Sequence, residues 1–204
     1  MSDLRSKQVV LLLFFFVTAL LMIQSCAQMA SPPGGKKDTL APKLVTSIPL
    51  NKSKNYKGKK LELTFNEYVN VRNLNQELLI TPNIGTYQTR IRPNGLSILL
   101  DSALKDQTTY TFNFRNAIED MSERNVGKNI KLVFSTSNTI DSLSITGKIK
   151  LVDLNKAFEN VLVGLYPYND TLRIDKAKPY YFTKTDTSGI YTLENLAQGK
   201  YYMA

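Results

Sequence analysis

The sequence predicts an all-β protein in which two β-sandwich modules follow a short N-terminal segment of different character. Two observations lead to this prediction. From residue 43 onward, apolar side chains recur at every second position in about seven short segments separated by turn residues, which is typical of half-buried strands in a sandwich. No stretch of comparable length in this region keeps a helical period.

The composition fits a globular protein and excludes several kinds of site. Of 204 residues 43% are hydrophobic, and 11 Tyr and 9 Phe supply large side chains for a core. Histidine is absent, which excludes Ser-His-Asp and Cys-His nucleophile systems and His-ligated zinc. The single cysteine excludes an intrachain disulfide and a Cys-rich metal site. We therefore expect no enzyme, no catalytic residue, no cofactor and no metal, with carboxylate chemistry or hard-cation binding as the residual possibility.

The formal net charge of +9 favours contact with phosphates, anionic lipid headgroups or acidic polysaccharide, although many lysines simply solvate the faces of strands. The basic residues are scattered, and no arginine-rich helix or interleaved aromatic motif is present, so we expect no nucleic-acid partner. The densest cluster, Lys57 to Lys60, precedes a predicted strand and is interpreted as protection of a loop and a sheet edge.

Residues 1–25 have the pattern of an export signal. Arg5 and Lys7 precede an apolar run from Val9 to Ile23, which is shorter than the roughly 18 to 20 residues that a spanning helix needs. The alternative is an uncleaved membrane anchor. Residues 26–40 include Pro32, Pro33, Gly34 and Gly35, lack apolar periodicity, and are predicted to be a tether, with the globular part beginning near Asp38.

The segment Ile23-Gln24-Ser25-Cys26 resembles the lipobox of bacterial lipoproteins, although Gln24 departs from the commonest pattern. The resemblance implies that the signal is cut before Cys26 and that Cys26 carries a diacylglycerol, with an acylated amino terminus. Acyl chains at about 0.8 kcal/mol per buried CH₂ would hold a domain on a bilayer. The competing interpretation, a reactive thiol, lacks a histidine or other organised base to lower the pKa of the cysteine.

The first module is predicted from seven segments, with the apolar residues of each on one face. They lie near 43–48, 61–69, 78–81, 87–92, 95–101, 109–114 and 131–136. The stretch AIEDMSERN, Ala117 to Asn125, is predicted to be a polar loop. Leu104 lies six residues before Tyr110, which opens a strand, and this spacing predicts a tyrosine corner in which the phenol oxygen bonds to nearby backbone.

Residues 41–137 resemble the SbsA-type bacterial Ig-like domain. The resemblance rests on DTLAPKLVTSIPLN, LELTFNEYV, LKDQTTYTFNF and LVFST, which are separated along the module. It implies an Ig-like β-sandwich. Modules of this family serve as spacers, adhesin stalks and accessory domains, so the resemblance says more about fold than about function.

Residues 141–204 resemble the carboxypeptidase regulatory-like, or transthyretin-like, β-sandwich family. The matching features are SITGKIKLVD, NVLVGLYPYN and the hairpin TDTSGIYT with the following LENLAQGKYY. Asp186 and Gly189 bracket a turn, and a calcium-ligand role for Asp186 is the alternative. Because the family continues beyond the strand at Lys200 to Ala204, we expect this module to be partial and the chain to be part of a longer protein.

Three functions are compatible with these features. The leading one is a non-catalytic, lipid-anchored envelope protein that acts as stalk, scaffold or binding surface. The second is binding of glycan or anionic envelope polymer through Tyr87, Tyr180 and Tyr181, although the last two fit a buried strand equally well. The third is a hydrolase that would pair Glu67 with Glu119, Asp120 or Glu123.

The location follows from a resemblance as well. The pairing of modules resembles envelope lipoproteins of Bacteroidota, which implies the outer membrane. Acidic residues soon after the lipidated cysteine accompany surface display in that group, whereas Ala-Gln-Met-Ala-Ser follows Cys26. We therefore expect the periplasmic face, with the membrane as partner through Cys26 and an envelope polysaccharide or protein as a possible second partner.

Overall fold

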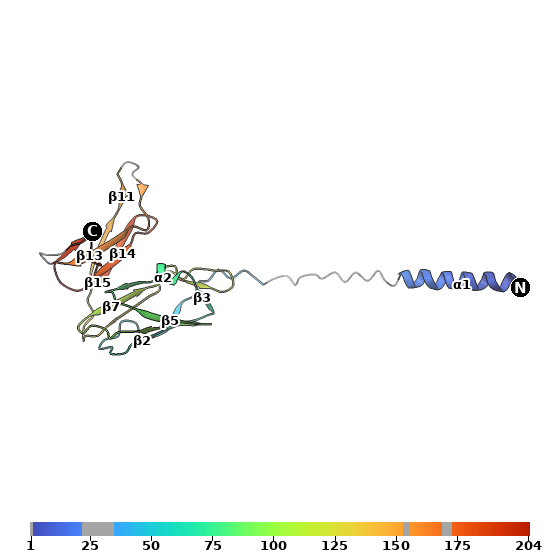
Figure 1. Cartoon of the computed structure of the whole chain (residues 1–204), viewed down its shortest axis with the longest axis horizontal. Helices are drawn as coiled ribbons and strands as arrows, with labels where there is room; N and C mark the ends of the chain where they lie inside the picture. The colour runs from blue at the N-terminus through green and yellow to red at the C-terminus, as the bar shows by residue number, and fades with distance from the viewer. Residues whose placement is uncertain (1, 22–34, 153–155, 169–172) are drawn as a thin grey trace. The chain divides into compact units, whose positions relative to one another are not determined.

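The computed structural model describes residues 2–21, 35–152, 156–168 and 173–204 (Figure 1). These residues belong to two units, residues 1–37 and residues 38–204. The second unit is all-β apart from one short helix, as the sequence predicts.

The first unit contains the helix α1 (Ser2–Leu21). Its residues are mostly long and apolar, without the glycine or proline that would interrupt a helix. Among the described helices, none combines the length and the apolar character that crossing a membrane requires. The end of the predicted signal, the lipobox and Cys26 lie outside the described residues.

The first β module consists of the strands β1 to β9 and one helical turn, α2 (Leu74–Glu77). The strands are β1 (Leu44–Ile48), β2 (Lys60–Phe65), β3 (Val69–Val71), β4 (Leu79–Thr81), β5 (Tyr87–Arg92), β6 (Gly95–Leu100), β7 (Thr109–Asn113), β8 (Ile118–Asp120) and β9 (Lys131–Ser135). One sheet has the order β1-β2-β6-β5, a second has the order β4-β7-β9, and β3 pairs with β8. All these pairs are antiparallel.

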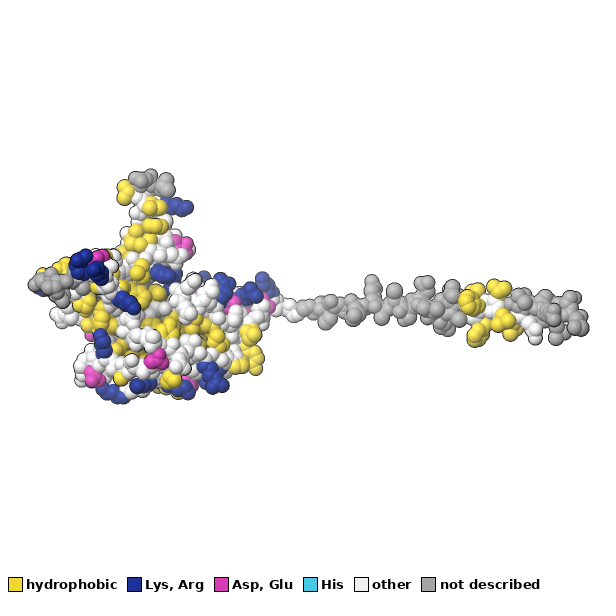
Figure 2. Space-filling model, viewed as in Figure 1, with side chains coloured by type: hydrophobic (Ala, Val, Ile, Leu, Met, Phe, Trp, Pro, Cys, Tyr) yellow, Lys and Arg dark blue, Asp and Glu magenta, His cyan; other side chains and the backbone are white. Residues whose placement is uncertain are grey.

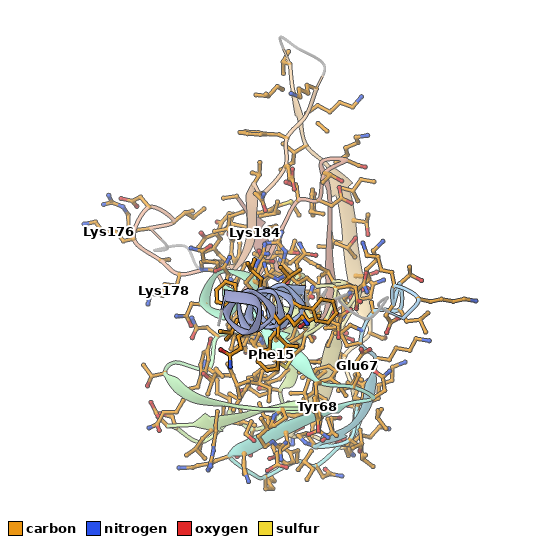
Figure 3. The ribbon with its side chains drawn as sticks, turned by 90° about the vertical axis from the view of Figure 1, so that its right-hand side faces the viewer. Phe15, Glu67, Tyr68, Lys176, Lys178 and Lys184 are labelled. Atoms are coloured by element: carbon orange, nitrogen blue, oxygen red, sulfur yellow. The ribbon has the colours of Figure 1, made fainter. Side chains whose placement is uncertain are left out.

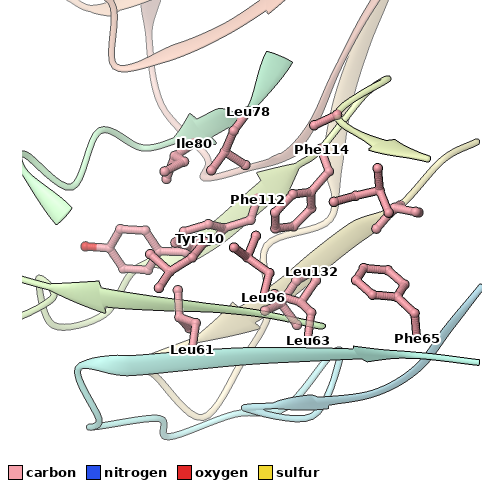
Figure 4. Close-up of a cluster of buried hydrophobic side chains, with 14 of the residues drawn as sticks. Leu61, Leu63, Phe65, Leu78, Ile80, Leu96, Tyr110, Phe112, Phe114 and Leu132 are labelled. Carbon is pink, nitrogen blue, oxygen red and sulfur yellow. The ribbon is translucent and has the colours of Figure 1, made fainter. Parts of the chain in front are cut away.

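The core of this module lies between its two larger sheets (Figure 4). Every second residue of β2 and β6 faces inward, and the register places Leu63 opposite Leu96. From the other sheet, Phe134 stacks on Tyr110 and Phe112 with ring centroids 5.8 and 5.9 Å apart. The fully buried aliphatic and aromatic residues of the two sheets are Leu61, Leu63, Leu96, Ile98, Tyr110, Phe112, Leu132 and Phe134.

Two predictions about strands in this module are wrong in detail. The predicted strand at 61–69 is broken, because β2 ends at Phe65 and β3 begins at Val69. The predicted polar loop at 117–125 contains β8, all of whose residues are buried. The chain turns between β2 and β3, and β3 then provides β8 with a partner that covers its backbone groups.

The second β module begins with β10. They are β10 (Leu143–Lys148), β11 (Lys150–Leu151), β12 (Lys156–Ala157), β13 (Leu162–Pro167), β14 (Tyr181–Lys184), β15 (Ile190–Leu196) and β16 (Tyr201–Met203). The sheets are β10-β15, β11-β12 and β14-β13-β16. Its core contains Val163, Leu165, Tyr181, Leu193 and Leu196. The last strand, β16, pairs with β13.

The two β modules contact each other within the second unit. Strands β14 and β15 approach β4 and β7. The side-chain amide of Asn195 donates to the hydroxyl of Thr111 at 3.0 Å, and the backbone N–H of Asp141 donates to the hydroxyl of Thr109 at 2.9 Å. Lys131 Nζ lies 2.5 Å from Glu194 Oε2. The second module is therefore fastened to the outer side of the sheet β4-β7-β9.

Candidate functional site

The outer face of the sheet β1-β2-β6-β5 carries a hollow of about 560 Å³. The register places residues of three strands side by side on this face, with Ser97 opposite both Glu62 and Arg90. Three cationic side chains line the hollow, those of Lys60, Arg90 and Arg92, against one acidic side chain, that of Glu62. We call this hollow the β5 cationic hollow.

Arg92 lies opposite Gly95 of β6. A Cβ at Gly95 would clash with the carbonyl oxygen of Leu63 and would lie 3.4 Å from Arg92 Nη2, so the guanidinium lies close to this glycine, whose missing side chain the neighbouring strand β2 requires. Arg92 Nη1 is 3.5 Å from Glu62 Oε2, while Nε and Nη2 are buried and have no hydrogen-bond partner among the described residues. Arg92 therefore lines the hollow, and one buried edge of its guanidinium has no hydrogen-bond partner among the described residues.

Glu62 is held in its charged form. A hydrogen bond from Lys60 lowers the pKa of the Glu62 carboxyl, burial opposes this, and the positive charges of Lys60 and Arg92 lower it further. At neutral pH Glu62 therefore neutralises part of the cationic charge, and the three cations leave the hollow positive.

Sequence reasoning missed this site. The signal was present in the period of two, since Lys60 and Glu62 alternate with core leucines and Arg90 and Arg92 share a face of β5. The period alone does not show which strands are neighbours. The pairing of β6 with both β2 and β5 brings these side chains together.

A second hollow of about 710 Å³ lies where the two β modules meet. Two of the cations in its lining already have acidic partners. Arg115 Nε is 3.7 Å from Glu77 Oε2, and Lys131 pairs with Glu194. Elsewhere, basic side chains are spread over the face seen in Figure 2 with acidic ones among them, as the scattered sequence pattern predicts. We take the β5 cationic hollow as the candidate, because its Arg92 also has buried donors without a hydrogen-bond partner among the described residues.

The carboxylates of the predicted hydrolase pair occupy structural positions instead. Glu119, only 1% exposed, accepts a hydrogen bond of 2.8 Å from the amide of Asn70 and lies 3.7 Å from Arg72 Nη1. Asp120 accepts hydrogen bonds from the backbone N–H groups of Glu123, Arg124 and Asn125 and from the Asn125 side chain. Both carboxylates thereby hold β8 and the loop after it.

The other two carboxylates of the predicted pairs are Glu67 and Glu123. Glu67 lies beside Tyr68 between β2 and β3 (Figure 3), and the amide of Asn66 donates to it at 3.4 Å. Glu123 Oε2 is buried without a hydrogen-bond partner among the described residues. Within that part of the chain, no group of three or more acidic, His or Cys side chains is arranged to hold a metal ion.

The three tyrosines considered for glycan stacking do not form a platform. Tyr181 is 2% exposed and belongs to the core of the second module, against which Tyr180 also packs. Tyr87 packs against the core of the first module. The structure therefore gives these rings packing roles and does not bring all three together.

The predicted turn at Asp186 is confirmed. Asp186 Oδ1 accepts hydrogen bonds of 2.8 and 2.9 Å from the backbone N–H groups of Ser188 and Ile190. Gly189 has φ of +73°, a conformation that suits glycine. The carboxylate is thus occupied in closing the hairpin between β14 and β15.

Comparison with known proteins agrees with the fold of the first module. Residues 38–136 match the family model described as "Bacterial Ig-like domain". None of the curated proteins shows significant sequence similarity to the chain.

Two solved structures share weak similarity. The N-terminal part of the bacterial S-layer protein SbsC is 13% identical with a TM-score of 0.34, over 76% of this chain and 44% of that structure. The chain thus spans less than half of that structure. An L,D-transpeptidase from Mycobacterium smegmatis is 10% identical with a TM-score of 0.34, over 71% of this chain and 76% of that one. The antiparallel sandwich of the first β module agrees with the match of residues 38–136 to the bacterial Ig-like family model.

Proposed function

We propose that this protein is a non-catalytic, lipid-anchored component of a bacterial envelope whose two β modules act as a stalk or scaffold. The observation that carries the proposal is the direct attachment of the second module to the Ig-like domain. Asn195 binds Thr111, Asp141 binds Thr109, and Lys131 pairs with Glu194. Several contacts across one junction resist bending, which is what a spacer requires.

The arrangement of acidic residues supports a role without catalysis. Glu119 and Asp120 are buried and engaged by neighbouring amides, so neither is presented to a substrate. The interior between the larger sheets is filled by aliphatic and aromatic side chains. A packed sandwich of this kind offers binding surfaces at its faces and edges.

The anchor and the location belong to the same proposal. Lipid at Cys26 would hold the β modules at the outer membrane, on its periplasmic face, with residues 26–40 as the tether. The support is the lipobox-like sequence Ile23 to Cys26 after an apolar run, and the absence of acidic residues directly after Cys26.

Metabolic labelling tests the anchor. The whole chain is produced in a Bacteroidota host with labelled palmitate, and the Cys26→Ala variant is compared with the native sequence. We expect label in the native protein and none in the variant. We also expect an inhibitor of the lipoprotein signal peptidase to cause accumulation of a larger, unprocessed form.

Ser25→Ala is the matched control, because it keeps a small residue directly before the cysteine and should keep the label. A native protein without label, or equal labelling of Cys26→Ala, would contradict lipid anchoring. Protease treatment of intact cells then distinguishes the two faces of the outer membrane, since a periplasmic protein stays protected.

A further inference from the structure

We propose that the β5 cationic hollow binds the carboxylates of an acidic polysaccharide. This inference goes beyond the proposed stalk and does not depend on the lipid anchor, so each can fail without the other. It rests on the geometry of Arg92, on the charge of the hollow and on the strands that build it.

The unpaired edge of Arg92 points to an oxyanion. Nε and Nη2 form the side of the guanidinium that binds a carboxylate with two parallel hydrogen bonds, and neither has a partner among the described residues. A buried donor without a partner costs free energy. A ligand that pairs with such a donor therefore gains more binding free energy than one that pairs with a solvated donor. The Arg92 side chain as a whole is 36% exposed and lines the hollow, but this edge is buried, so binding requires a change of the Arg92 rotamer that turns the edge toward the ligand.

The charge of the hollow favours an anionic ligand over a neutral one. Lys60, Arg90 and Arg92 surround it, and Glu62 offsets one of the three charges. Glu62 Oε2 is 3.5 Å from Arg92 Nη1, so Glu62 already interacts with the guanidinium. A ligand carboxylate that binds Arg92 therefore competes with Glu62 for it.

The shape of the hollow favours a sugar polymer over an acidic peptide. Its lining comes from β2, β6 and β5, so it extends across the face of the sheet. A peptide that added to the sheet as a new strand would lie along the free edge of β5, outside this hollow. Gln88 and Ser97 add neutral hydrogen-bonding groups to the lining, and such groups match sugar hydroxyls between regularly spaced carboxylates.

Binding to polygalacturonate tests the proposal. The whole chain, purified in a non-ionic detergent, is titrated with this polymer at low ionic strength, with neutral dextran and polyglutamate as comparison ligands. We expect Arg92→Gln to weaken polygalacturonate binding about tenfold or more, because a charge-assisted bidentate pair is lost. Arg92→Lys keeps the charge but not the two parallel donors of the guanidinium, so its affinity for polygalacturonate should lie between those of the native protein and Arg92→Gln.

Arg173→Gln is the matched control. Arg173 is an exposed residue of the second module that pairs with Asp175, and its removal changes the net charge by the same amount. Its affinity for polygalacturonate should stay within about twofold of the native value. Equal weakening by Arg92→Gln and Arg173→Gln would overturn the proposal, because general charge attraction would then explain the binding.

Glu62→Gln provides a second variant that does not remove the arginine. With the competing carboxylate neutral, polygalacturonate should bind several-fold more tightly, whereas Asp175→Asn should leave the affinity unchanged. Unchanged binding by Glu62→Gln overturns the proposal even if Arg92→Gln fails to fold. Equal affinity for dextran overturns it as well, and equal affinity for polyglutamate assigns the hollow to acidic peptides instead.

Discussion

The phenol oxygen of Tyr110 accepts a hydrogen bond of 2.9 Å from the backbone N–H of Lys105. Tyr110 is 1% exposed, and Leu104 packs against the same core. The tyrosine corner predicted from the spacing of Leu104 and Tyr110 is therefore confirmed. The bond closes the loop that leads from one sheet of the first β module to the other.

We predict that Tyr110→Phe destabilises the protein by about 1 to 2 kcal/mol, because a buried backbone donor loses its acceptor while the ring is kept. Urea unfolding of both proteins measures the difference. Tyr68→Phe is the control, since Tyr68 is 66% exposed and its substitution should change the stability little. A loss at Tyr110 no larger than at Tyr68 would mean that the corner contributes nothing to stability.

The parts of the fold that were predictable from sequence are those in which one face of a strand is apolar. Leu61, Leu63 and Phe65 show the period of two, and β2 lies where they predict it. The strand β8 was missed because Glu119 and Asp120 look like loop residues. Both can be buried in a strand because their carboxylates accept hydrogen bonds from side-chain amides. Asn70, far away in the sequence, donates to Glu119, and Asn125, in the turn after β8, donates to Asp120.

The β5 cationic hollow could not be predicted from the sequence either, because it depends on which strands are neighbours. The sequence places Arg90 and Arg92 on one face of a predicted strand, but it does not state that β6 separates that strand from β2. Nor does it show that Arg92 lies opposite Gly95 and close to it in the assembled sheet. Strand order and close packing are properties of the assembled sheet.

The Asp120 carboxylate predicts a dependence of stability on pH. Burial raises the pKa of Asp120, but the hydrogen bonds from Glu123, Asn125 and Arg124 outweigh it, and the net pKa is lowered. The lowered pKa means that folding favours the charged form. Its stabilisation is fully present above the unfolded pKa of about 4 and is lost as the pH falls through the folded value.

Melting temperatures of the native protein and of Asp120→Asn, measured from pH 7 to pH 2.5, check this. We expect the variant to melt lower at pH 7 and the difference to narrow below about pH 4. Asp101 is exposed, so the melting temperature of Asp101→Asn should differ little from that of the native protein at neutral pH. Melting curves of native protein and Asp120→Asn that stay equally far apart down to the lowest pH would contradict the assigned role.

Alanine substitutions at two glycines with positive φ, Gly85 and Gly189, distinguish the cost of backbone strain from the cost of a steric clash. Gly85 has φ of +79° and open space around its Cα, whereas Gly189 has φ of +73° and lies against the carbonyl of Ile149 and the backbone nitrogen of Phe158. Alanine in a left-handed conformation costs about 1 to 2 kcal/mol. We predict this loss for Gly85→Ala and a larger one for Gly189→Ala, measured by thermal unfolding. Equal losses would show that the turn after Asp186 adjusts to a methyl group.

The junction between the two β modules gives the last prediction. Thr111 is 8% exposed, and its hydroxyl accepts the hydrogen bond from Asn195. Thr111→Val keeps the shape but leaves the amide of Asn195 without this acceptor. A loss of about 1 kcal/mol at the junction should make its local opening about fivefold more frequent.

Hydrogen exchange of the backbone amide of Asp141 reports that opening, because this amide donates to Thr109 across the same junction. Thr146→Val is the control, since Thr146 bonds Thr192 on an exposed face within the second module and should not change exchange at Asp141. If exchange at Asp141 is fast in the native protein and unaffected by Thr111→Val, the modules move independently. The stalk would then be a flexible chain of two domains, and the contacts of Asn195 and Glu194 would not set its length.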